Sequence, residues 1–108
     1  MPDDELFYGC VGFEWDKHNA VKIWKKHRVS IFEIEGIFFN QPRRGVVVAD
    51  DLRHSGKEKR FYALGRTDSG RSLFVVFTIR RDKIRVISAR DMSRKERMVY
   101  DSNEEKDS

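Results

Sequence analysis

The stretch "IRVISARDMSRKERMVY", residues 84–100, decides the fold of this chain because it joins a strand to a helix. Its first part, 84–89, begins with the spaced apolar residues of a buried strand. The second part opens with Ser93, followed three residues later by Glu96, which is the pattern of a capping box at a helix start. We therefore predict a last strand over 84–89 and a final helix from about 94 to 102.

The same stretch is strongly basic. Residues 80–97 hold eight Lys or Arg and three acidic residues, whereas both ends of the chain are acidic. A basic middle between acidic ends favours a patch that meets phosphate groups, with a solubilising surface as the plain alternative. The whole chain has 108 residues, a net charge of +4 and 39% hydrophobic residues, which indicates one domain with a single core.

Three further strand candidates lie upstream of this stretch, at 46–49, 59–66 and 72–79. The second alternates between two faces, and the third is apolar on both faces, as expected of a central strand. Tight turns are predicted on either side of the third strand: one at 67–71, where Gly70 is available for a positive φ, and one at 80–83.

The N-terminal third predicts two helices. A short strand candidate at 11–15 ends at Asp16, whose side chain can cap a helix over 17–27. Ser30 and Glu33 form a second capping box, and Pro42 stops the helix that follows.

These elements predict an α+β fold: a four- to five-stranded, mainly antiparallel meander sheet with two N-terminal helices and one C-terminal helix. We expect the helices to pack mainly on one face of the sheet. The domain is expected to span 13–102, between a polar lead-in at 1–12 and an acidic flexible tail at 103–108.

An ordered set of motifs runs along the chain: FEWD (13–16), KKHRVSIFEIEGIFF (25–39), HSGKEKRFYALGR (54–66), GRSLFVVFTIR (70–80), then ISAR and SRKER before a Tyr. Over about 13–101 this set resembles the BrnT toxin family of bacterial type II toxin–antitoxin systems. Where that family usually has Gly after Lys26 and His27, this chain has Arg28. Arg28 must therefore adopt a positive φ or end the helix differently.

The resemblance implies a RelE-like ribonuclease fold and cleavage of RNA without a metal or cofactor. It also implies neutralisation by a BrnA-like antitoxin of the ribbon-helix-helix type. The expected complex is a heterotetramer of two toxins and two antitoxins that binds operator DNA through the antitoxin.

Metal-free RNA cleavage sets requirements on the side chains. The ribose 2′-hydroxyl is the nucleophile, so the site needs a base, cations for the charged phosphorane and an acid for the leaving oxygen. Arg suits the phosphorane because its planar fork donates twice to phosphate oxygens. With the resemblance, the candidate catalytic residues are Lys26, Glu58, Arg60, Arg80 and Arg90. The candidate RNA-binding residues are Tyr62, Arg66, Arg85, Arg94 and Lys95.

Arg90 is the strongest of these candidates. It directly follows a buried strand and lies beside the N-terminus of the last helix, where anions are favoured. Its alternative role is a salt bridge to Asp91 or Glu96. Glu58 is either the base or the group that orients an Arg, and its alternative role is an exposed carboxylate paired with a neighbouring Lys.

Tyr62 lies between Arg60 and Arg66 on one face of the 59–66 strand. Two arginines with an aromatic ring between them suit an RNA platform, because the ring can stack on a base. The alternative is a solvated sheet face that avoids aggregation. Lys26 can join this platform only if its helix end abuts the basic face, whereas the helix dipole alone explains a cation there.

Other chemistries find no support in the residues. The three His and one Cys lack the spacing of a metal site, and there is no phosphate-cradling glycine loop or serine elbow. A single Cys and the lack of a long apolar run predict a cytoplasmic protein without membrane contact. Three functions stay open: a ribonuclease toxin that inhibits translation, a nucleic-acid-binding module without chemistry, and an antitoxin-docking part of a repressor complex.

Overall fold

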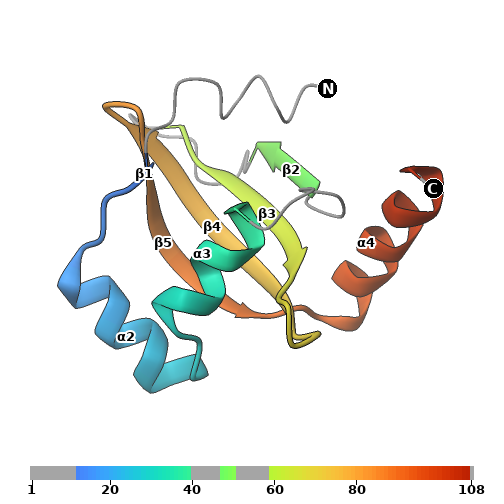
Figure 1. The fold of residues 1–108 in the computed structure, drawn as a ribbon, viewed down its shortest axis with the longest axis horizontal. Coiled ribbons are helices and arrows are strands. Elements are labelled where there is room, and N and C mark those ends of the chain that lie inside the picture. Colours follow the sequence, from blue (N-terminus) through green and yellow to red (C-terminus); the bar gives the residue numbers. More distant parts are fainter. Residues whose placement is uncertain (1–11, 40–46, 51–58, 108) are drawn as a thin grey trace.

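A five-stranded sheet forms the centre of the molecule, with helices on both of its faces (Figure 1). This computed structural model describes residues 12–39, 47–50 and 59–107. The elements in chain order are β1 (Gly12–Phe13), α2 (Lys17–His27), α3 (Ile31–Phe39), β2 (Val47–Asp50), β3 (Phe61–Arg66), β4 (Ser72–Arg80), β5 (Lys83–Asp91) and α4 (Arg94–Asp107). No helix in the described ranges is long and apolar enough to cross a membrane.

The strands lie in the order β1-β5-β4-β3-β2. Strands β2 to β5 form an antiparallel meander, whereas β1 pairs with β5 in parallel and makes the sheet mixed. The predicted α+β class and the order of the elements are confirmed. The parallel edge strand and the length of α4, which continues to Asp107, differ from the expectation.

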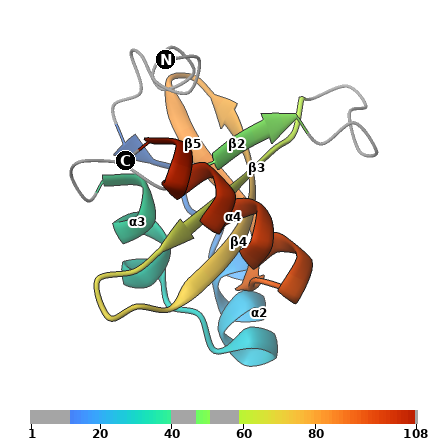
Figure 2. The same ribbon diagram turned by 90° about the vertical axis from the view of Figure 1, so that its right-hand side faces the viewer.

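The two faces of the sheet carry different helices. Along β3, Ala63 joins the main core with α2 and α3, whereas Leu64 packs with Met92 and Tyr100 beside α4. Helices α2 and α3 therefore cover one face and α4 covers the other, which Figure 2 shows from the α4 side. The expectation that the helices pack mainly on one face holds for α2 and α3. Helix α4 is the exception, because the apolar residues of β3 and β4 point both ways.

The main core explains why α3 lies so close to the sheet. Ile34, Ile37 and Phe38 of α3 are buried there, and a Cβ on Gly65 of β3 would lie only 2.8 Å from the Cβ of Ile37. A side chain at this position would push α3 away from the strand. The remaining members of this core are Ile23, Val29, Ala63, Leu73, Val75, Phe77, Ile84, Val86 and Ala89.

The three predicted helix starts have their predicted caps. The Asp16 carboxylate accepts hydrogen bonds from two α2 amides, at 2.8 and 3.3 Å. Ser30 and Glu33 form a reciprocal capping box, with bonds of 2.9 and 3.1 Å. Ser93 and Glu96 form the other, with bonds of 2.8 and 3.2 Å. These local patterns determine where each helix begins, because each cap satisfies amides that the helix leaves unpaired.

The end of α2 settles the question raised by Arg28. Its φ is 55° and its ψ is 40°, which is the left-handed conformation, and its amide donates to the Trp24 carbonyl at 2.9 Å. Arg28 thus takes the backbone conformation that Gly favours, and its guanidinium lies over the Trp24 ring at 5.4 Å. The predicted turns also form, with Gly70 at φ 92° and with Arg81 and Asp82 both at positive φ.

A β-bulge in β5 determines which way the end of that strand points. The pairing with β4 runs from Arg80↔Lys83 to Phe77↔Val86, then skips Ile87 and resumes at Val76↔Ser88. An extra residue reverses the alternation of side chains, which is how bulges re-aim a strand. Val86 and Ala89, an odd number of residues apart, therefore both face the main core, and Arg90 faces the α4 side.

Candidate functional site

Three side chains from three neighbouring strands form a row on the α4 face of the sheet. The Cζ of Arg90 lies 4.2 Å from the ring centroid of Phe74, and the rings of Phe74 and Tyr62 stack with centroids 5.4 Å apart and 27° between planes. The register explains the row, because Arg90 of β5 is directly opposite Phe74 of β4. We call Arg90, Phe74 and Tyr62 the arginine–aromatic row. Its flat rings and cation are groups on which a nucleobase and a phosphate can bind.

The Arg90 guanidinium is held by a carboxylate. Its two terminal nitrogens donate to the two oxygens of Glu96 at 2.8 and 2.9 Å, and one of them also donates to the Asp91 carbonyl at 3.1 Å. Burial alone would raise the pKa of Glu96, but hydrogen bonds from Arg90 and the Ser93 amide bring that pKa below its ordinary value. The bond to Glu96 raises the pKa of Arg90. The side chain of Arg90 keeps 38% of its surface exposed, so the cation is oriented and still accessible.

A basic hollow lies beside α4. It has a volume of about 600 Å³ and is lined by Arg66, Gly70, Ser72, Arg94, Arg97, Met98 and Asp101.

 Within the hollow the guanidinium of Arg66 lies 5.2 Å from the ring centroid of Tyr100 and 3.5 Å from Asp101. Three arginines against one aspartate leave the hollow positively charged, which suits an anionic ligand.

The first turns of α4 border both the row and the hollow. Glu96 binds Arg90 of the row, and the next residue, Arg97, lines the hollow. One turn later, Tyr100 packs on Leu64, and Asp101 contacts Arg66. A chain of phosphates and bases that follows α4 would therefore meet stacked rings on one side and arginines on the other.

Comparison with known proteins identifies the family. The family described as "Ribonuclease toxin, BrnT, of type II toxin-antitoxin system" matches residues 15–96. The chain belongs to the BrnT family of ribonuclease toxins. Its fold is similar to the crystal structure of the Brucella abortus ribonuclease toxin BrnT, with a TM-score of 0.57 and 18% identity over 78% of this chain and 99% of that chain. At this level of identity, the structural likeness shows a shared fold. No curated protein matches the sequence.

Family membership confirms the resemblance, and the structure then sorts the ten candidate residues of this BrnT-family chain. Arg90 and Tyr62 lie in the arginine–aromatic row, and Arg66 and Arg94 line the basic hollow. Arg60, half-buried, precedes β3 two residues before Tyr62, and Lys95 is exposed on the first turn of α4. Glu58 lies outside the described residues.

The other three candidates lie away from the arginine–aromatic row and the basic hollow. Lys26 is exposed on α2, which covers the opposite face, so the condition set for it above is not met. Arg85 pairs with Glu14 at 3.6 Å and with Asp16 at 3.4 Å, at the start of α2. Arg80 ends β4 six residues beyond Phe74, which is about 20 Å along a strand.

Sequence reasoning missed Phe74 and Arg71. Phe74 was one of several apolar residues in a central strand, and only the register with β5 reveals that it lies under Arg90. Arg71 stood in a predicted turn, where an arginine is normally exposed. In the structure 27% of its side chain is exposed, and it ties three parts of the chain together.

The Arg71 clasp consists of one guanidinium and four acceptor residues. It donates to the Asp91 carboxylate at 2.7 and 3.1 Å and to Glu33 at 3.3 Å. It also donates to the carbonyls of His27 and Arg28, at 3.0 and 2.7 Å. The hydrogen bond to Asp91 raises the pKa of Arg71 and lowers that of Asp91. This clasp joins the β3–β4 hairpin to β5 and to the connection between α2 and α3.

Proposed function

We propose that this chain is a metal-independent endoribonuclease toxin that inhibits translation in the cytoplasm, with Arg90 at the centre of its site. One observation carries the proposal: the Arg90 guanidinium is fixed over Phe74 and by Glu96 on a face that also presents the Tyr62 ring. Preoriented cations stabilise developing charge better than mobile ones, because they need no reorganisation during the reaction.

The roles that we propose for the individual residues follow from the geometry. An unpaired base stacks on the arginine–aromatic row, and Arg90 donates to the equatorial oxygens of the phosphorane. Arg66 and Arg94 in the basic hollow bind neighbouring phosphates, with Lys95 beside them. The ribose 2′-hydroxyl attacks the adjacent phosphorus, which restricts cleavage to RNA.

The proton transfers rest on the family resemblance rather than on described contacts. Glu58 is the proposed base, or the group that orients an Arg, and it precedes Arg60 and Tyr62 closely along the chain. Lys26, Arg80 and Arg85 stay candidates from the sequence, and neither the row nor the hollow includes them. Among the described residues no group of His, Cys, Asp and Glu is arranged to hold a metal ion.

Cleavage of purified RNA in EDTA tests the proposal. The wild-type chain is expected to cut single-stranded RNA, and Arg90→Ala to cut it at least about 100-fold more slowly, as for loss of an oxyanion-stabilising donor. Lys83→Ala removes an exposed cation from the other end of β5 and serves as the matched control, with unchanged cleavage. Activity that disappears in EDTA would contradict metal independence, and full activity of Arg90→Ala would move the site elsewhere.

A second function is favoured by the Glu96 carboxylate. Because it already neutralises Arg90, the face can also serve as a binding surface without chemistry, in autorepression or in antitoxin docking. This alternative gives RNA binding with a steep salt dependence and no cleaved product. The same EDTA assay, run beside a binding measurement, separates the two functions.

The proposed partner follows from the type II toxin–antitoxin family. A BrnA-like ribbon-helix-helix antitoxin is expected to neutralise the chain in a heterotetramer of two toxins and two antitoxins. The antitoxin would carry the contacts to operator DNA. Light scattering on the co-expressed complex checks this stoichiometry, and a mass that fits one toxin and one antitoxin would contradict it.

A further inference from the structure

Helix α3 is apolar on two sides but buried on one. Its sequence IFEIEGIFF has six large apolar residues, of which Ile34, Ile37 and Phe38 are buried in the main core. The other three are exposed: Ile31 to 40%, Phe39 to 53% and Phe32 to 85%. A helix that is apolar all round normally has both sides covered.

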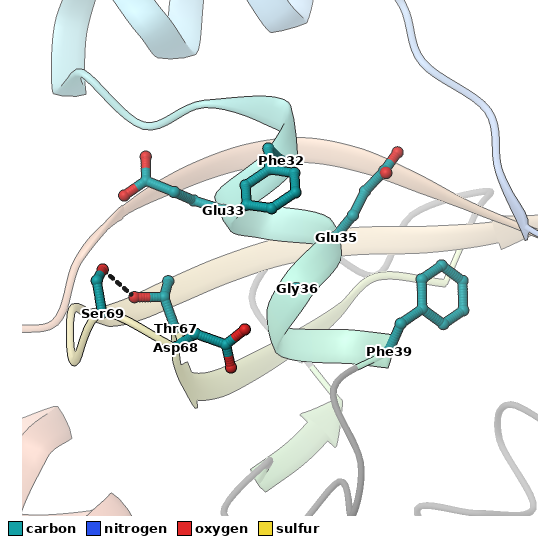
Figure 3. Close-up of a pocket in the computed structure, with 8 residues that line it drawn as sticks. All are labelled: Phe32, Glu33, Glu35, Gly36, Phe39, Thr67, Asp68 and Ser69. Atoms are coloured by element: carbon teal, nitrogen blue, oxygen red, sulfur yellow. Dashed lines mark hydrogen bonds between the residues drawn. The ribbon is translucent and has the colours of Figure 1, made fainter.

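The exposed side of α3 forms one wall of a groove (Figure 3). The groove has a volume of about 330 Å³ and is lined by Phe32, Glu33, Glu35, Gly36, Phe39, Thr67, Asp68 and Ser69. The β3–β4 hairpin supplies its other wall, where Thr67 and Ser69 share a hydrogen bond of 3.0 Å. The groove thus lies between a helix and a turn that the Arg71 clasp holds together.

The shape of this α3 groove suits another helix. Phe32, Gly36 and Phe39 have the i, i+4, i+7 spacing of one helical stripe, with aromatic rings at both ends and no side chain in the middle. Gly in a helix interior lowers stability by about 0.5–1 kcal/mol relative to Ala. At Gly36 this loss would be offset if the backbone of a bound helix approached closely.

The charge of the groove is opposite in sign to the net charge of the chain. Among the residues that the structure describes, its lining contains Glu33, Glu35 and Asp68 and has no Lys or Arg, although the chain carries a net charge of +4. Arg71 compensates Glu33, and the Trp15 indole donates to Glu35 at 2.8 Å without neutralising it. Such a surface repels nucleic acid and attracts a cationic segment.

We infer that the α3 groove binds an amphipathic helical segment of a protein partner, with large apolar side chains along one face and Lys or Arg beside them. Aromatic side chains of the groove would pack on the apolar face of that helix, and the acids would meet its cations. The groove lies on the side of the sheet opposite the arginine–aromatic row. A partner there therefore leaves the row open, and this inference does not depend on RNA cleavage.

A peptide selection tests the inference. A library of random helical 16-residue peptides is selected for binding to the intact chain, with the Phe32→Ala variant used to remove peptides that do not depend on the groove. The surviving peptides are expected to have a net positive charge and apolar residues one helical turn apart. They are expected to bind Gly36→Leu, a variant that is not used in the selection, at least tenfold more weakly than wild type.

Controls separate this groove from other exposed apolar surfaces. Trp24→Ala removes another exposed aromatic side chain, which lies on α2 and is 47% exposed, and this variant is expected to bind the selected peptides like wild type. Phe32→Ala should unfold at the wild-type midpoint, because most of the Phe32 surface is already in water. Survivors that are acidic, or a selection without survivors, would overturn the inference. So would a homodimer in sedimentation that Phe32→Ala dissociates, because the occupant would then be a second copy.

Discussion

Arg71 and Arg90 use the same chemistry on opposite faces of the sheet. The two arrangements meet at neighbouring positions of β5. Arg90 itself points toward α4, and the next residue, Asp91, points toward Arg71. All five N–H groups of Arg71 meet acceptors, two of which are main-chain carbonyls. Arg90 instead binds one carboxylate and one main-chain carbonyl and stacks on a ring.

The sequence distances between partners show what each arrangement does. The partners of Arg71 are 20 to 44 residues away, so its bonds exist only when three parts of the chain have folded together. Glu96 is six residues from Arg90 and is already held by its own capping box. The Arg71 clasp therefore belongs to the stability of the fold, whereas the Arg90 pair orients a cation at an accessible face.

The largest difference is expected in stability. Arg71→Met leaves two carboxylates and two carbonyls without their donor and should lower the free energy of unfolding by about 2–3 kcal/mol. Arg90→Met leaves Glu96 and the Asp91 carbonyl without this donor, but Glu96 keeps its bond to the Ser93 amide, so a smaller loss of about 1 kcal/mol is expected. Urea denaturation of both variants measures the two values, and equal losses would remove the distinction between the two arginines.

The next effect concerns RNA affinity on the Arg90 side alone. Tyr62→Leu removes a ring from the arginine–aromatic row and should weaken binding of single-stranded RNA about tenfold, since stacking contributes roughly 1–3 kcal/mol per base. Tyr62→Phe keeps the ring and should restore the affinity. Fluorescence anisotropy with a labelled RNA checks both. A defect in Tyr62→Phe as large as that in Tyr62→Leu would show that the hydroxyl, rather than stacking, binds RNA.

Acid should weaken the Arg71 side more than the Arg90 side. The pKa of each of Glu33, Asp91 and Glu96 is lower in the folded chain than its ordinary value near 4. Their contribution to stability is therefore present above about pH 4 and is lost as the pH falls through the lowered values. We expect Asp91→Asn to reduce the loss of unfolding free energy between pH 7 and pH 3 more than Glu96→Gln does. Urea denaturation at both pH values measures this loss. The reverse order would contradict the comparison.

The smallest effect is a change in salt dependence. Arg97 lines the basic hollow, and Arg97→Gln should reduce the slope of log affinity for single-stranded RNA against log salt by about 0.7. Lys83→Gln, at the other end of β5, should leave the slope unchanged. Titration at four salt concentrations measures both slopes. An unchanged slope in Arg97→Gln would place the phosphate contacts outside the hollow.

Much of the secondary structure could be predicted because its signals are local. Asp16, Ser30 and Ser93 each bond to amides two or three residues away, so the sequence itself contains both partners of every cap. The alternation of β3 likewise predicted that Tyr62 and Arg66 share a face. The sequence favours Arg90 for a local reason, its place beside a helix N-terminus, and the salt bridge to Glu96 that is its alternative role is present in the structure.

The sites depended on contacts that no local pattern contains. Phe74 lies under Arg90 because of the register between two strands, and Arg71 found acceptors on segments 20 to 44 residues away. The charge of Lys26 was evident from the sequence, but the face of the sheet that α2 covers was not. A residue's neighbours across a sheet are determined by pairing and packing, which involve the whole chain.

By itself, the sequence determined the helix starts, the strands, the family and the excess of arginine near the last strand. Only pairing and packing of the whole chain separate Arg71, which ties parts of the fold together, from Arg90, which is oriented at an accessible face. The reason is the bulge at Ile87: without the extra residue, Arg90 would point into the main core and Asp91 away from Arg71. One residue changes which face a strand presents, because side chains alternate with a period of two.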